Sequence, residues 1–229
     1  MIFDYKSFNL RKITPFAGLM GCFLVLFGLY ASASNYFRPD GYSPANHFIS
    51  ELGLSDASTM AHIFNRSVMS GGILMMIFAL GLGNFIGKGK REKVATLVGM
   101  IATLAFSGIG YFTAVDHTSH LIVAMIFFGG AMVSILLFSY TIWVDRESGL
   151  NVYISFHGVL IAVIYVITVF APKELLFQSI NDPDHFVRPD IWELSILEWV
   201  YCFLILSWIV LVALNMIYIE YLAPKEDYR

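Results

Sequence analysis

The fold is decided by the stretch from residue 120 to residue 144, HLIVAMIFFGGAMVSILLFSYTIWV, which contains no Lys, Arg, Asp or Glu. A helix that spans the hydrocarbon core of a bilayer needs about 20 mostly apolar residues, and this stretch is long enough. Comparable stretches occupy residues 15–36, 61–86, 94–115, 152–172 and 195–222. The sequence therefore predicts an all-α integral membrane protein, a bundle of six transmembrane helices that forms one domain over residues 1–229.

The composition agrees with a membrane location. Of the 229 residues, 58% are hydrophobic and only 14% are charged, too few to cover a water-soluble globule. The formal net charge of -3 leaves no basic surface for nucleic acid, so the predicted partners are membrane lipids or another membrane protein. Cys22 and Cys202 lie far apart in apolar stretches and predict neither a disulfide framework nor a zinc site.

The distribution of positive charge predicts the orientation of the spans, because Lys and Arg are retained on the cytoplasmic side of a membrane. Most of the 14 basic residues precede the first span, separate the second from the third or the fourth from the fifth, or close the chain. These residues are Lys6, Arg11, Lys12, Lys88, Lys90, Arg91, Lys93, Arg146, Lys225 and Arg229. Both termini are therefore predicted to be cytoplasmic, and residues 37–60, 116–119 and 173–194 to form outer loops.

The first outer loop carries a histidine and a carboxylate at helical spacing. Ser43 and Pro44 are typical of a helix start and Gly53 of a helix end, which predicts a short interfacial helix at about residues 44–52. His47 and Glu51 are four residues apart and would share one face of it. They would form either a general base with its orienting partner or a solvated pair that only stabilises the helix, and the spacing does not separate these alternatives.

A second polar group lies where the third span meets the fourth. Asp116 and His120 would stack on one face if the fourth helix begins early, as an acid and a base or as two ligands of a divalent metal. The alternative is that Asp116 or Thr118 caps the fourth helix and that His120 packs at the membrane interface, hydrogen-bonded to water. The possible cofactor is therefore a divalent metal at this junction.

Ionisable groups also lie inside or near the spans, where they usually face the bundle interior and have a partner. Arg66 on the second span and Glu198 on the sixth are predicted to pair, with Asn65 beside them. The alternative is that both long side chains reach the lipid headgroups. His157, alone in the fifth span, is predicted to hydrogen-bond to a neighbouring helix.

Particular residues resemble a known family. The segment NHFISELG at residues 46–53, Phe64 and Asn65 at the start of a span, and GIGYF at residues 108–112 resemble the domain-of-unknown-function family 998 of prokaryotic six-span membrane proteins. The layout is also similar to that of the Frag/DRAM/Sfk group, which is linked to lipid remodelling. The resemblance implies a multi-pass protein of the prokaryotic inner membrane. Its motif residues are His47, Ser50, Glu51, Asn65, Asp116 and His120.

Two functions from different classes follow from these residues. The first is a pocket at the outer face that binds or modifies a lipid or another amphiphile, by acid/base or metal-assisted chemistry if the protein is an enzyme. Its predicted catalytic residues are His47, Glu51, Asp116 and His120, and its predicted ligand-binding residues are Ser50, Asn65, Arg66 and Glu198. The second is a non-catalytic scaffold or accessory subunit of a membrane complex. An open pocket favours the first function, and motif residues paired only among themselves favour the second.

Overall fold

The computed structural model describes residues 10–39, 41–183 and 185–223, and over these residues the chain is a helical bundle. The long helices are α1 (Leu10–Ala33), α2 (Ala61–Ile86), α3 (Lys90–Tyr111), α4 (His117–Val144), α5 (Tyr153–Phe170) and α7 (Glu193–Ile217). Shorter elements are the 3-10 helix η2 (Ile49–Gly53), the helix α6 (Glu174–Asn181) and the π-helical turn η3 (Tyr218–Leu222). Six helices are long and apolar enough to cross a membrane, so the predicted architecture is confirmed.

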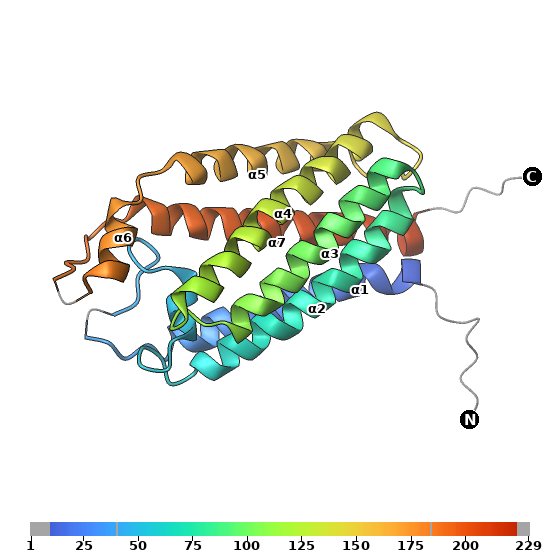
Figure 1. Ribbon diagram of the computed structural model, residues 1–229. Helices are drawn as coiled ribbons and strands as arrows, with labels where there is room; N and C mark the ends of the chain where they lie inside the picture. The colour runs from blue at the N-terminus through green and yellow to red at the C-terminus, as the bar shows by residue number, and fades with distance from the viewer. Residues whose placement is uncertain (1–9, 40, 184, 224–229) are drawn as a thin grey trace, which may run out of the picture.

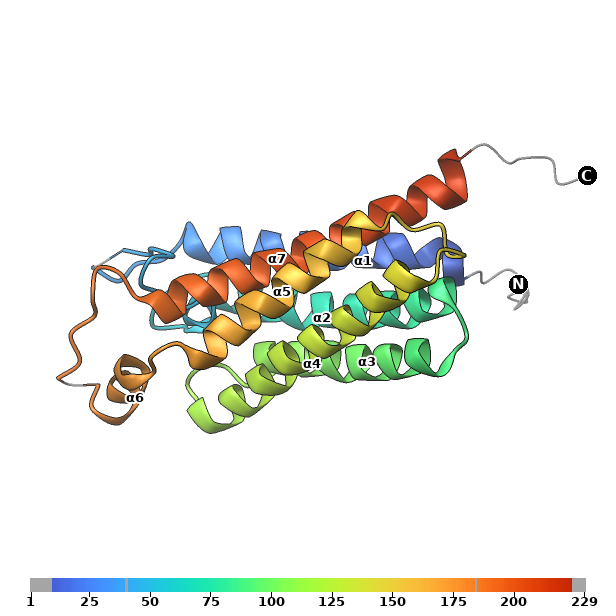
Figure 2. The same cartoon turned by 90° about the horizontal axis from the view of Figure 1, so that it is seen from above.

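The six spans form a closed ring (Figures 1 and 2). Each helix packs along its neighbour in chain order, and α7 closes the ring by lying between α5 and α1. The start of α1 and the end of η3 lie at one end of the bundle, here called the terminal end (Figure 1). Residues 34–60, 112–116 and 171–192 connect the helices at the opposite end, here called the loop end. The three loops that were predicted to share one side of the membrane therefore share one end of the bundle.

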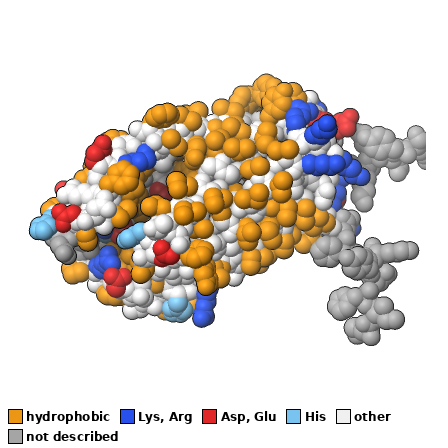
Figure 3. Space-filling view, viewed as in Figure 1, with side chains coloured by type: hydrophobic (Ala, Val, Ile, Leu, Met, Phe, Trp, Pro, Cys, Tyr) orange, Lys and Arg blue, Asp and Glu red, His pale blue; other side chains and the backbone are white. Residues whose placement is uncertain are grey.

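The outer surface of the ring is apolar, as a bilayer requires. Figure 3 shows apolar side chains over the middle of the viewed face and charged side chains gathered toward its two ends. Large apolar side chains such as Phe23, Leu97 and Met125 point outward. An apolar surface of this extent is unusual in a soluble monomer, whereas in a membrane lipid chains cover it.

Small residues bring α1 and α2 into close contact. A Cβ atom added to Gly28 would lie 2.6 Å from Cβ of Ser67, and one added to Gly21 would lie 3.1 Å from the carbonyl oxygen of Gly71. Such close approach compensates for the weak hydrophobic drive between helices in lipid, because it increases van der Waals contact. The α1–α2 pair is thereby held as a unit.

A short helix lies between α1 and α2, as predicted, but it is the 3-10 helix Ile49–Gly53 and does not cover residues 44–52. The amides of Asn46 and His47 donate to the Ser43 carbonyl in a turn, and only Ile49–Gly53 is helical. In an α-helix the His47 carbonyl would accept the Glu51 amide, but here Glu51 donates to Phe48 at 3.2 Å. The His47 carbonyl is instead occupied by side chains of α7, so a tertiary contact replaces the local helix.

His157 packs as predicted. Its Nε2 atom lies 2.9 Å from Oγ of Ser207 and 3.1 Å from the carbonyl oxygen of Leu204, both on α7. These contacts join α5 to α7 inside the membrane-spanning region.

Candidate functional site

The loop at residues 43–53 is seated on the start of α7. Oγ of Ser195 and Nε1 of Trp199 donate to the carbonyl oxygen of His47 at 2.7 and 3.0 Å. The Ile49 amide donates to Oε2 of Glu198 at 2.8 Å. Because residues 195, 198 and 199 are three and four positions apart, they share one face of the helix. That face of α7 therefore fixes the position of the loop.

The partner of Glu51 is Arg188, which lies in the loop before α7. Nη1 and Nη2 of Arg188 donate to Oε1 and Oε2 of Glu51 at 3.0 and 2.8 Å, a two-point contact. The Phe48 amide donates to Oε1 as well, at 2.9 Å, and Nη1 also donates to the Asn46 carbonyl at 2.6 Å. The two side chains are 23% and 12% exposed, so water screens the pair only partly. Glu51 and Arg188 thus clamp two loops of the loop end together.

His47 is a buried component of the same loop. Its side chain is 1% exposed, and its ring centroid lies 5.5 and 5.3 Å from those of Tyr36 and Tyr42. Nδ1 lies 2.7 Å from Oδ1 of Asn46. Within the described residues no hydrogen bond or ion pair joins His47 to Glu51, so the predicted base with its orienting carboxylate is wrong in this structure.

Tyr42 supports the loop from the same cluster. Its hydroxyl donates to the carbonyl oxygen of Phe48 at 3.1 Å. Burial, followed by the negative charges of Glu198 and Glu51, raises the pKa of the Tyr42 hydroxyl above its ordinary value. The hydroxyl therefore keeps its proton and acts as a donor at neutral pH.

Asp116 and His120 have separate structural roles. The Asp116 carboxylate caps α4 by accepting the Ser119 amide at 3.2 Å, and its hydrogen bonds with Ser119 lower the pKa of Asp116. Nδ1 of His120 lies 2.7 Å from the carbonyl oxygen of Phe112 and joins the end of α3 to α4. The predicted cap at Asp116 is therefore confirmed, and the partner of His120 is a backbone carbonyl. Neither side chain forms a hydrogen bond or ion pair with residues 43–53 in the described part of the chain.

Asn65 and Arg66 are neighbours on α2 with different surroundings. Nδ2 of Asn65 donates to the Gly53 carbonyl at 3.0 Å and so ties η2 to α2. Arg66 is exposed, whereas Glu198 lies beneath the loop. The predicted pair of Arg66 and Glu198 is wrong: no ion pair joins them among the described residues, because their side chains occupy the outside and the inside of the ring.

An apolar cavity of about 50 Å³ lies directly beneath the loop. Its polar lining side chains are Ser50 and Glu198, with Cys202 one turn further along α7. Its apolar lining includes Val25, Phe64, Val68, Ile109, Phe128 and Leu206, which come from α1, α2, α3, α4 and α7. Ser50 and Glu198 therefore stand at the loop-end side of an apolar space inside the ring, whereas His47 and Glu51 form the structure above it.

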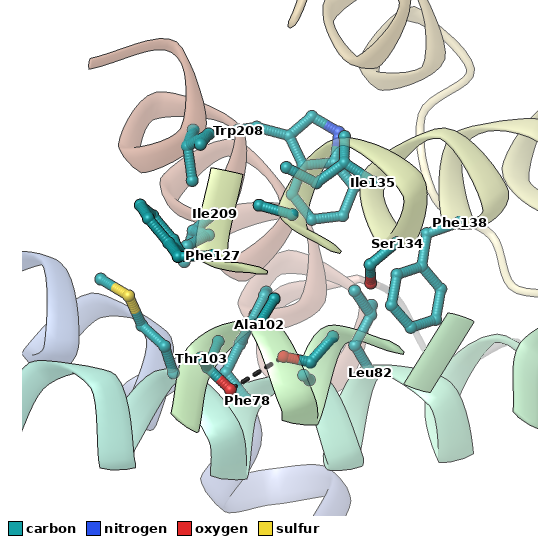
Figure 4. Close-up of a pocket in the computed structure, with 15 residues that line it drawn as sticks. Phe78, Leu82, Ala102, Thr103, Phe127, Ser134, Ile135, Phe138, Trp208 and Ile209 are labelled. Atoms are coloured by element: carbon teal, nitrogen blue, oxygen red, sulfur yellow. Dashed lines mark hydrogen bonds between the residues drawn. The ribbon is translucent and has the colours of Figure 1, made fainter. Parts of the chain in front are cut away.

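A second cavity of about 50 Å³ continues toward the terminal end. The two cavities share the lining residues Met75, Phe127 and Ile205. Figure 4 shows the rings of Phe127, Phe138 and Trp208 around the second cavity. The hydroxyl of Thr103, also in the lining, donates a hydrogen bond to the Gly99 carbonyl at 2.9 Å. From Glu198 to Ile209, α7 advances about 16 Å, so the two cavities form a narrow series along the bundle.

The described residues do not form a set of ligands for a metal ion. Within residues 10–39, 41–183 and 185–223, no three His, Cys, Asp or Glu side chains are placed to hold a metal ion. Asp116 and His120 are accordingly not joined by a third such side chain from the described part of the chain.

Comparison with known families identifies the chain. A family model described as "Protein of unknown function (DUF998)" matches residues 18–215. The chain belongs to the DUF998 family. The match begins within α1 and ends within α7, and it covers α2 to α5 and the loops of the loop end in full, so the resemblance carried by NHFISELG is confirmed. No curated protein and no solved structure matches the chain. The DUF998 description names no activity, so the argument for function rests on the site.

Three residues that hold this DUF998 site together were not predicted, namely Arg188, Ser195 and Trp199. A signal was available for Arg188, because it is the single cation in an otherwise acidic segment at residues 182–193. Ser195 lies three positions before Glu198 and four before Trp199, a helical spacing that marks a polar face at the start of an otherwise apolar helix.

Proposed function

We propose that this DUF998 protein binds an amphiphile inside its helical bundle, with the polar end at Ser50 and Glu198 and the apolar chain in the two cavities. The observation that carries the proposal is an apolar space inside the ring with a carboxylate at its loop-end side. Its lining, mostly apolar with a few converging polar groups, is of the kind found in small-molecule sites, whereas its volume is smaller than theirs.

Glu198 indicates which polar end fits. Oε2 accepts the Ile49 amide, whereas no described residue donates a hydrogen bond to Oε1. A carboxylate in apolar surroundings is stabilised by a further donor. An ammonium or hydroxyl group on the ligand supplies one, whereas a second carboxylate would be repelled.

The size of the cavities indicates a single chain. About 10–15 Å³ of such space holds one water molecule. Two spaces of about 50 Å³ in series therefore suit one narrow apolar chain better than a lipid with two tails.

The test is a binding measurement with three single-chain probes. Full-length protein in nanodiscs is titrated with dodecylamine, dodecanol and dodecanoate, and bound probe is counted by native mass spectrometry. We expect the amine to bind about tenfold more tightly than the carboxylate, since hydrogen bonds to charged groups have this magnitude. Glu198→Gln should remove that preference, and binding of all three probes at equal strength by the unaltered protein would contradict the proposal.

A matched pair of variants locates the chain. Cys202→Phe places a ring in the cavity, whereas Val200→Phe places the same ring on the exposed face of α7 two residues away. We expect Cys202→Phe to weaken every probe and Val200→Phe to weaken none. Equal effects of the two variants on probe binding would indicate that the probes bind on the outer surface of the protein and not in the cavity.

A non-catalytic scaffold is the second candidate function. It is favoured by the motif residues Glu51, Asn65 and Asp116, whose hydrogen bonds all lie within the loop end. If none of the three probes binds while Glu51→Ala still lowers stability, the motif serves only to shape the loop end and the scaffold function is supported.

A further inference from the structure

A hollow of about 400 Å³ lies between α5 and α7, on the half of the bundle toward the terminal end. It is lined by Asn151, Tyr153, Ile154, Phe156, His157, Leu160, Leu211 and Asn215. Phe156, Leu160 and Leu211 are also exposed on the outer surface of the ring. The hollow therefore opens toward the lipid, unlike the two cavities inside the ring.

The hydrogen bonds around His157 determine what its ring offers to this hollow. The Ser207 hydroxyl donates to the Leu204 carbonyl at 2.9 Å, so its oxygen is left to accept from Nε2 of His157. The Leu204 carbonyl oxygen, which lies 3.1 Å from Nε2, can likewise only accept a hydrogen bond. Nε2 therefore carries the proton of the neutral ring and Nδ1 is an acceptor. In the part of the chain that the structure describes, no residue donates a hydrogen bond to Nδ1.

The lining of the hollow is uncharged. It contains no Lys or Arg that would neutralise a phosphate. Arg146, in the loop before α5, donates through Nε to the Trp143 carbonyl at 3.1 Å. The amides of Asn151 and Asn215 lie at the start of α5 and the end of α7, and Leu160 lies further along α5. The hollow is thus polar toward the terminal end and apolar toward the middle of the bundle.

We propose that this hollow binds a neutral lipid with a free hydroxyl group, of the diacylglycerol class, whose hydroxyl donates to Nδ1 of His157. One acyl chain lies along Phe156, Leu160 and Leu211, and the open side leaves the second chain in the bilayer. With the termini in the cytoplasm, as the basic residues predict, this lipid belongs to the cytoplasmic leaflet. The site is independent of the amphiphile proposed for the interior cavities.

The test compares two lipids that differ only in the hydroxyl. Full-length protein in detergent is titrated with dioleoylglycerol and with its analogue in which the hydroxyl is replaced by hydrogen, and native mass spectrometry counts the bound lipid. We expect the unaltered protein to prefer dioleoylglycerol by about three- to tenfold, the range of one net hydrogen bond. Equal binding of the two lipids would overturn the proposal without any variant.

Two variants assign the preference to the hollow. His157→Phe keeps an aromatic ring but removes Nδ1, and we expect it to bind both lipids equally. Leu104→Ala, at a side chain 60% exposed on α3, reports lipid bound elsewhere around the ring and should keep the preference. A preference that survives in folded His157→Phe protein would overturn the assignment. If that variant does not fold, the comparison of the two lipids on the unaltered protein still tests whether the hydroxyl group is recognised.

Discussion

At the scale of single residues, the loop end depends on a partly shielded ion pair between segments that are distant in the chain. Glu51 receives two hydrogen bonds from Arg188 and one from the Phe48 amide. Arg38 and Asp56 form a second pair at the same end, but their side chains are 30% and 72% exposed. The two pairs have similar N–O distances and differ in how far water screens them.

Arg188→Ala should lower the free energy of unfolding by about 2–4 kcal/mol, because it leaves the Glu51 carboxylate shielded from water without its cation. Arg38→Ala should cost less than about 1 kcal/mol, as exposed pairs do. Chemical denaturation of the purified protein in detergent measures both. The double variant Glu51→Gln with Arg188→Ala should recover part of the loss. Equal losses for Arg188→Ala and Arg38→Ala would contradict this account of the clamp.

At the scale of elements, the helices are fixed by how closely they approach rather than by amphipathic faces. Gly28 on α1 faces Ser67 on α2, where an added Cβ would lie 2.6 Å from Cβ of Ser67. On α4, a Cβ added to Gly129 would meet only the hydroxyl end of the Tyr165 side chain, at 3.1 Å. That hydroxyl can move aside, whereas the Ser67 Cβ is fixed to its helix.

Gly28→Ala should therefore destabilise the bundle by about 1–3 kcal/mol through overpacking. Gly129→Ala should have a much smaller effect, and Ser67→Gly combined with Gly28→Ala should restore part of the stability. Thermal unfolding followed by circular dichroism checks the three variants. Similar unfolding temperatures for Gly28→Ala and Gly129→Ala would show that the α1–α2 contact tolerates a wider spacing.

The spans were predictable because length and apolar character are local properties of the chain. Which face of each helix points inward was not predictable, since residues inside and outside the ring are equally apolar. The pair of Arg66 and Glu198 failed for this reason: the sequence places both near one end but does not give the rotation of α2 or α7. The pair of Glu51 and Arg188 was missed because its members are 137 positions apart. The short helix begins at Ile49 and not at residue 44, since side chains of α7 occupy the His47 carbonyl.

At the scale of the whole molecule, the terminal end is predicted to face the cytoplasm. In a functional variant with Cys22 and Cys202 replaced by Ala, Asp56→Cys should react with a membrane-impermeant maleimide added to intact cells. Lys90→Cys should react only after the membrane is opened, because α3 begins at the terminal end. Both positions are exposed to solvent, so differences in burial do not explain the contrast. The reverse pattern of labelling would show that the terminal end faces away from the cytoplasm and would contradict the proposed orientation.

The closure of the ring by α7 also has a consequence for biosynthesis. Residues 43–53 leave the ribosome early, yet Ser195, Glu198 and Trp199, which hold them, belong to the last span. During translation this segment therefore lacks its hydrogen-bond partners on α7 until nearly the entire polypeptide has been synthesised. A nascent chain halted before α7 would therefore leave the carbonyl of His47 and the amide of Ile49 without the side chains that bond them in the finished protein.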